Sequence, residues 1–167
     1  IGVTHIIRIG SAGALQEGIA LGDLILVEGA VRDDGASRIY APDSYPGVAD
    51  HDLLAACIRA GREKGFRCHV GLCRSHDSFY IDNNEDISAA WSKRGVLGSD
   101  METAALYTIA ALRGIRAVSV LNNVVLYGAD AAKGISQYAS GDAAMANGEQ
   151  SEIQTALEAF VRLEASP

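Results

Sequence analysis

Short aliphatic runs alternate with helical patterns along this chain, and glycines or polar clusters separate one from the next. The β-branched run at residues 4–9 ends in a glycine-rich turn and predicts a buried strand. Further strands are predicted at residues 24–27 and 30–31 on either side of Gly29, at 68–72 and at 116–121. Such continuous apolar strands are typical of a mostly parallel sheet that is covered on both faces.

Helical spacing predicts the layers that cover this sheet. Asp50 is an N-cap candidate for a helix that ends before Gly65, and further helices are predicted at residues 87–93 and 103–113. A terminal amphipathic helix is indicated by the spacing of Ile153, Ala156, Leu157, Phe160 and Val161. Its acidic residues are predicted to lie on the surface, and they are Glu149, Glu152 and Glu158.

Three polar segments are predicted to lack regular structure. Residues 33–46 are rich in Asp, Gly and Pro and predict an exposed loop. The acid-amide cluster at residues 82–86 predicts a solvated loop. Residues 122–148 combine Gly, Ala, Asp and Ser with little periodicity, which predicts a mobile flap or an irregular excursion.

The alternation of strands and helices predicts an α/β fold with a mostly parallel or mixed central sheet flanked by helices. Sheets of this class bind ligands in the crevice beyond the carboxyl ends of their strands. The length of 167 residues predicts a single domain over residues 1–167.

The composition of the chain argues against nucleic acid, a membrane and a metal ion as partners. The chain has 14 Lys and Arg against 21 Asp and Glu, a net charge of −7, which disfavours binding to nucleic acid but leaves room for one small anion. The longest aliphatic runs are far shorter than the roughly 20 residues of a membrane span, so no membrane partner is predicted. Cys57, Cys68 and Cys73 lack C-x-x-C spacing and predict buried thiols in a reducing compartment, the cytoplasm, rather than a metal site.

The turn after the first strand contains groups that can hold an anion. Arg8 supplies a guanidinium, Ser11 a hydroxyl, and Gly10 and Gly13 open backbone amides. The alternative is that Arg8 pairs with a carboxylate beside an ordinary turn, and the residues alone favour neither reading. The turn matches neither of the glycine-rich motifs typical of dinucleotide and nucleoside-triphosphate sites.

Other candidate ligand contacts are individually weak. Glu102, next to Met101, could accept hydrogen bonds from two sugar hydroxyls, although capping of the following helix explains it better. Phe79 and Tyr80 could stack on a flat heterocycle, but aromatic pairs after a strand more often serve packing. The Asn83 amide suits the edge of a base, while solvation is its default.

Several segments in order closely resemble the nucleoside phosphorylase family, and uridine phosphorylases in particular. They are THIIRIGSAGALQ (residues 4–16), GDL (22–24), VRDDGAS (31–37) and SDMETAA (99–105). The resemblance extends to the terminal helix, but family members carry a further N-terminal segment. We therefore expect this chain to be the C-terminal two-thirds of such a domain, and we do not expect it to turn over substrate alone.

The resemblance implies phosphorolysis of a nucleoside to free base and ribose 1-phosphate. It assigns phosphate to Arg8 and Ser11 with support from Gly10, and ribose to Met101 and Glu102, with Arg8 and Glu102 as the catalytic pair. It places four residues around the base: Phe79, Asn83, Val124 and Val125. Inorganic phosphate is the co-substrate, no cofactor is implied, and the expected assembly is a homo-oligomer based on dimers, such as a trimer of dimers.

The identity of the base rests on two opposing comparisons. Purine members place an Asp where this chain has Val124 and Val125, and an aliphatic pair that cannot donate a proton favours a pyrimidine, with uridine first. Uridine phosphorylases read uracil with Gln and Arg, whereas the matching positions here are Asn83 and Glu85. The alternatives are a purine nucleoside phosphorylase, a hydrolytic nucleosidase of the same fold, and a non-catalytic nucleoside-binding relative.

Overall fold

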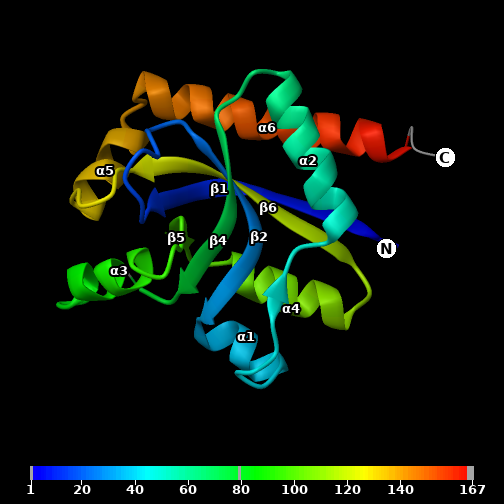
Figure 1. Cartoon of the computed structure of the whole chain (residues 1–167), viewed down its shortest axis with the longest axis horizontal. Helices are drawn as coiled ribbons and strands as arrows, with labels where there is room; N and C mark the ends of the chain where they lie inside the picture. The colour runs from blue at the N-terminus through cyan, green and yellow to red at the C-terminus, as the bar shows by residue number, and fades with distance from the viewer. Residues whose placement is uncertain (1, 79, 165–167) are drawn as a thin grey trace.

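The computed structural model of this chain describes residues 2–78 and 80–164. Figure 1 shows a central sheet with helices on both sides. The strands are β1 (His5–Ala14), β2 (Leu24–Asp33), β3 (Gly47–Val48), β4 (Cys68–His76), β5 (Gly98–Asp100) and β6 (Arg116–Val125). The helices are α1 (Gly35–Tyr40), α2 (His51–Glu63), α3 (Asn84–Ser92), α4 (Thr103–Leu112), α5 (Ala131–Ala139) and α6 (Ala143–Glu164).

The sheet is mixed and closes on itself. Its strand order is β3-β2-β4-β5-β1-β6, and an additional pairing of β2 with β6 joins five of the strands into a ring. The pairs β1–β6, β2–β4 and β4–β5 are parallel, whereas β1–β5, β2–β3 and β2–β6 are antiparallel. The predicted mixed α/β architecture is therefore confirmed. The pairing of β1 with β5 covers only Gly13 and Ala14, so these two strands diverge toward the start of β1.

Apolar side chains on both faces of the sheet explain why these segments form buried strands. On one face, α2 and α6 lie side by side over β2 and β6, while α4 covers the other face (Figure 1). The β2 residues from Leu24 to Val27 are fully buried. Gly29 marks a shift in register against β4, as a glycine inside a strand pattern predicts.

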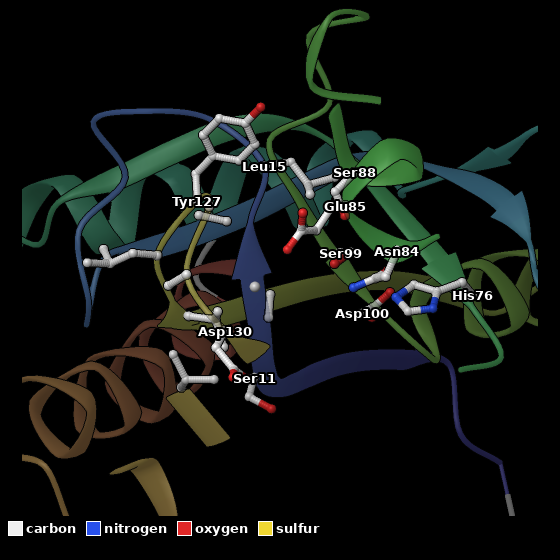
Figure 2. A pocket seen from close by; sticks show the side chains of 18 of the residues that line it. Ser11, Leu15, His76, Asn84, Glu85, Ser88, Ser99, Asp100, Tyr127 and Asp130 are labelled. Carbon is white, nitrogen blue, oxygen red and sulfur yellow. The ribbon is translucent and has the colours of Figure 1, made fainter. Parts of the chain in front are cut away.

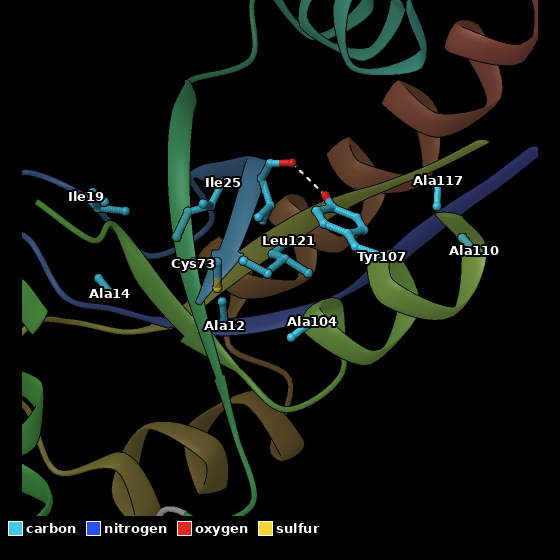
Figure 3. Close-up of a cluster of buried hydrophobic side chains, with 12 residues drawn as sticks. Ala12, Ala14, Ile19, Ile25, Cys73, Ala104, Tyr107, Ala110, Ala117 and Leu121 are labelled. Carbon is cyan, nitrogen blue, oxygen red and sulfur yellow. Dashed lines mark hydrogen bonds between the residues drawn. The ribbon is translucent and has the colours of Figure 1, made fainter. Parts of the chain in front are cut away.

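The core beneath α4 contains one large polar group whose hydrogen bonds are satisfied. The Tyr107 hydroxyl donates to the Val27 carbonyl oxygen at 2.6 Å and accepts from the Ser119 amide at 2.9 Å (Figure 3). A buried tyrosine is tolerated when its hydroxyl finds such partners. This residue thus ties α4 to both β2 and β6.

The prediction of an exposed loop at residues 33–46 is wrong for residues 35–40, which form α1. The Asp34 carboxylate accepts from the Ser37 amide at 2.6 Å and from the Ser37 hydroxyl at 2.7 Å, so Asp34 is the N-cap of that helix. Arg32 then donates to the carbonyl oxygens of Pro42 and Tyr45, both at 2.6 Å, and holds the remainder of the segment against the sheet. Asp and Gly in sequence resemble turn chemistry, but here Asp34 starts a helix.

The acid-amide cluster is also partly helical. Helix α3 begins at Asn84, so Glu85 and Asp86 form its first turn, three residues before the predicted start. Acidic side chains in a first turn are stabilised by the positive end of the helix dipole.

The expectation that residues 122–148 lack regular structure is wrong. This segment contains the end of β6, all of α5 and the start of α6. Two of its glycines serve close packing. A Cβ on Gly134 would lie 2.8 Å from Val125 Cγ2, and a Cβ on Gly148 would overlap the Asn122 side chain and lie 2.7 Å from the Cα of Gly22. The Asn122 amide group donates to the Met145 carbonyl oxygen at 2.8 Å, and Met145 is fully buried. Small residues here bring α6 onto β6.

Within the described residues, every helix is too short or too polar to cross a membrane.

Replacement of Gly148 by alanine tests the close approach of α6 to β6. We expect Gly148→Ala to lower the free energy of unfolding by about 1–3 kcal/mol, because the added methyl group overpacks the contact with Asn122 and Gly22. Asn147→Ala, at an exposed position of the same helix, is the control and should be nearly neutral. Urea denaturation measures both, and a Gly148→Ala protein as stable as the parent would contradict the packing.

Candidate active site

A cavity of about 900 Å³, here called the site cavity, opens beyond the carboxyl ends of the strands. Its walls come from the end of β1, the β5–α4 connection, the end of β6 with the loop that follows, and α3. Figure 2 shows Glu85 and Ser88 of α3 on one wall and Tyr127, after β6, on another. The position agrees with the crevice that the strand pattern predicts.

Arg8 and Glu102 are in direct contact at one end of the site cavity. The Arg8 Nη2 group donates to Glu102 Oε2, and Arg8 Nη1 lies 3.3 Å from Asp100 Oδ2. Glu102 lines the site cavity with 60% of its side chain exposed, whereas Arg8 lies behind it with 18% exposed. The arginine–carboxylate pairing that the sequence left open is thus present, between the two residues that the resemblance assigns to phosphate and ribose.

Asp100 organises this contact, and the sequence interpretation did not single it out. Its buried carboxylate accepts from the Ser75 hydroxyl at 2.6 Å, the Thr103 amide at 3.0 Å and the Thr103 hydroxyl at 2.5 Å. Asp100 therefore satisfies the first turn of α4, while Glu102, directly before that helix, makes no side-chain capping bond. The capping interpretation of Glu102 is wrong, and the Asp-x-x-Thr spacing was the signal that pointed to Asp100.

Gly10 allows the Arg8 side chain to fold back over β1. A Cβ at this position would lie 3.1–3.2 Å from the Arg8 guanidinium atoms. The Gly10 amide donates to Glu152 Oε2 at 3.1 Å. Gly10 thus shapes the site through the space that it leaves, and Ser11, next in the chain, is exposed and lines the site cavity.

Glu152 is buried beneath β1 and β6, so the prediction of a surface position on α6 is wrong. It is 3% exposed, and a single oxygen, Oε2, accepts from the amides of Gly10 at 3.1 Å and Asn122 at 3.0 Å. Burial raises the pKa of Glu152 to about 8, although the two amides and the charge of Arg8 act in the opposite direction. Helical periodicity could not separate this glutamate from its exposed neighbours.

His76 is a further lining residue without an assigned role in the sequence. It is 6% exposed, and its Nδ1 atom lies 2.9 Å from the Ser78 carbonyl oxygen. A carbonyl can only accept, so Nδ1 carries the proton and Nε2 is the acceptor in the neutral ring. Burial and the charge of Arg74 lower the pKa of His76 and favour this neutral form.

The residues expected around the base divide into three groups. Val124 and Val125 line the site cavity, as does Met101, which was expected at the ribose. Asn83 precedes α3, is exposed and does not belong to the lining, which instead contains Asn84 and Glu85. Phe79 lies outside the described residues.

Glu152 gives the fold a pH dependence that can be measured. Its carboxyl group titrates near 4.5 when unfolded and at about 8 when folded, so between these values the folded state holds a proton that the unfolded state has lost. The contribution of Glu152 to stability is therefore present at low pH and is lost as the pH rises to about 8.

We expect Glu152→Gln to remove this loss, because one amide oxygen can still accept from both backbone amides. The stability difference between variant and parent should grow from pH 5 to pH 8 in urea titrations. Glu17→Gln, at an exposed loop position, should keep the pH slope of the parent. Parallel curves for Glu152→Gln and the parent would contradict a buried, protonated Glu152.

Comparisons with known proteins show the family to which this chain belongs. The profile of the family described as "Phosphorylase superfamily" matches residues 1–160. A uridine phosphorylase of Thermococcus kodakarensis is 38% identical over 129 residues, which cover 70% of this chain and 47% of the relative. A DeoD-type purine nucleoside phosphorylase of Geobacillus kaustophilus is 42% identical over 121 residues, 72% of this chain and 50% of the relative.

A crystal structure of uridine phosphorylase from Vibrio fischeri superposes with a TM-score of 0.87 at 45% identity, covering 96% of this chain and 65% of that chain. This chain spans about half the length of the two curated relatives. The fold, the strand-end cavity and the match over residues 1–160 place the chain in the phosphorylase superfamily.

Proposed function

We propose that this chain forms the sugar- and phosphate-binding part of a nucleoside phosphorylase, which splits a nucleoside into free base and ribose 1-phosphate. The observation that carries the proposal is the contact of Arg8 with Glu102 at one end of the site cavity. An anion-binding guanidinium and a sugar-binding carboxylate must lie close together in such an enzyme, because the phosphate attacks the carbon that the sugar presents.

Arg8 has the capacity to bind phosphate. Its Nη1 atom is buried and, among the described residues, has no hydrogen-bond acceptor in good geometry, although Asp100 lies 3.3 Å away. A phosphate oxygen would supply that acceptor and would compete with Glu102 for Nη2. Asp100, whose other bonds tie it to α4 and β4, would remain in place and keep the guanidinium beside Glu102, which lines the site cavity.

The displaced Glu102 carboxylate would then accept hydrogen bonds from the ribose hydroxyls. The bound phosphate dianion would stabilise the positive charge that develops on the sugar as the glycosidic bond breaks. Ser11, which is exposed and lines the site cavity, would contribute a hydroxyl to the phosphate. No covalent nucleophile or cofactor enters this scheme, and inorganic phosphate is the second substrate.

The reaction is tested by incubating the complete protein with uridine, inosine and guanosine, each with and without phosphate, and quantifying free base and ribose 1-phosphate. Phosphorolysis predicts that base release requires phosphate and equals the ribose 1-phosphate formed. Release without phosphate would instead identify a hydrolytic nucleosidase, and binding without release a non-catalytic relative.

Substitution of Arg8 tests the phosphate site. We expect Arg8→Ala to raise the KM for phosphate by about 10- to 100-fold, the range for loss of a hydrogen bond to a charged group, with a much smaller change in the KM for nucleoside. Arg8→Lys keeps a charge beside Asp100, so its KM for phosphate should be intermediate. This variant also tests the site if the alanine variant does not fold. Arg38→Ala, on α1, is the control. An unchanged phosphate KM in the Arg8 variants would remove Arg8 from the site.

Substitution of Glu102 tests the exchange of partners. Glu102→Ala should raise the KM for nucleoside, because the ribose loses its acceptor. The same variant should lower the KM for phosphate or leave it unchanged, because Arg8 no longer has Glu102 as a competing partner. Initial rates at varied concentrations of each substrate separate the two effects. A rise confined to the phosphate KM would contradict the assignment.

A further inference from the structure

A carboxylate without a protein partner, that of Glu85, lies on the wall of the site cavity opposite Tyr127. Glu85, the second residue of α3, directs its carboxylate into the site cavity in Figure 2. Within residues 2–78 and 80–164 no hydrogen bond or ion pair occupies this group. The position is fixed by helix α3, whose Asn84 and Ser88 also line the site cavity.

The charged lining is otherwise acidic. The described lining contains no Lys or Arg, and its remaining carboxylates are Asp82, Asp100, Glu102 and Asp130. Asp100 and Glu102 surround Arg8 at the sugar end, whereas Glu85 lies on α3. His76 adds a second acceptor, Nε2, because its Nδ1–H is directed to the Ser78 carbonyl. Acceptors therefore dominate the wall formed by α3 and the end of β4.

We propose that this wall selects a nucleoside whose base presents two adjacent N–H donors, as guanine does, and that Glu85 is the residue that reads them. The inference rests on the proposed nucleoside function and names its substrate class. The N1–H and the 2-amino group of guanine are parallel neighbours, so each meets one oxygen of a single carboxylate in a paired, charge-assisted contact.

Other bases match this wall less well. Hypoxanthine keeps the N1–H but lacks the 2-amino group, so it makes one of the two bonds. Uracil flanks its single N3–H with two carbonyl oxygens, which the carboxylate repels. Adenine presents a lone pair on N1 beside its amino group. The expected order is guanosine, then inosine, then uridine and adenosine, because each unpaired acceptor or lost donor costs binding energy.

The remainder of the site cavity suits this assignment. A volume of about 900 Å³ is in the upper part of the range for small-molecule sites and leaves room for a purine nucleoside with phosphate. Val124 and Val125 supply apolar surface but form no hydrogen bond with their side chains, so they do not distinguish one base edge from another. Glu85, unlike the two valines, offers a carboxylate that can distinguish one base edge from another.

Binding measured without phosphate tests Glu85 independently of turnover. Calorimetry with guanosine, inosine, adenosine and uridine should give a Kd for guanosine at least tenfold below those for uridine and adenosine, and several-fold below that for inosine. Glu85→Gln should raise the guanosine Kd about tenfold and bring the guanosine and inosine values close together. Asp86→Asn removes the same charge from the same helix turn outside the lining and should change neither.

The outcomes separate this inference from the proposed reaction. Three results would overturn the role of Glu85. Uridine or adenosine could bind at least as tightly as guanosine, or no nucleoside could bind. The third is a ratio of the guanosine and inosine Kd values that Glu85→Gln leaves unchanged. Selective, Glu85-dependent binding of guanosine without phosphate-dependent release of base would support the role of Glu85 and overturn phosphorolysis. Phosphate-dependent cleavage of uridine by a protein that does not bind guanosine would support phosphorolysis and overturn the role of Glu85.

Discussion

The buried carboxylate of Asp100 is the constraint on which the geometry of the site depends. A charge removed from water is tolerated only when hydrogen bonds and an opposite charge replace its hydration. Asp100 obtains them from the Ser75 hydroxyl, from the amide and hydroxyl of Thr103, and from Arg8. The same requirement therefore joins β4 to the start of α4 and fixes the direction in which the arginine points.

A second buried carboxyl group, that of Glu152, lies close enough to Arg8 to feel its charge. Glu152 of α6 accepts from the amides of Gly10 and Asn122, so the terminal helix is attached to β1 and β6 close to the site. The raised pKa of Glu152 keeps most of this group uncharged at neutral pH. Arg8 thus forms its ion pairs with Asp100 and Glu102, without a full negative charge on Glu152 that would weaken the attraction of an anion.

Local signals predicted most of the long strands and helices, whereas the failures at Gly148 and Glu152 were decided by long-range packing. The apolar run of β1 and the Asp50 cap of α2 are readable because each depends on neighbours in sequence; Asp50 does accept from the Leu53 amide. Gly148 resembles a flexible residue until Asn122 and Gly22 are placed against it. Likewise, the burial of Glu152 depends on two strands more than twenty residues away, which no helical pattern contains.

Helix α3 lies at the periphery of the molecule, apart from the ring of strands (Figure 1), and none of its residues is fully buried. The end of the cavity where Glu102 contacts Arg8, by contrast, is built from strand ends that pairing around the ring holds in register. We therefore expect substitutions on α3 to change the lining of the cavity at little cost to folding. The side chains on this wall can therefore change while the ring of strands keeps its geometry.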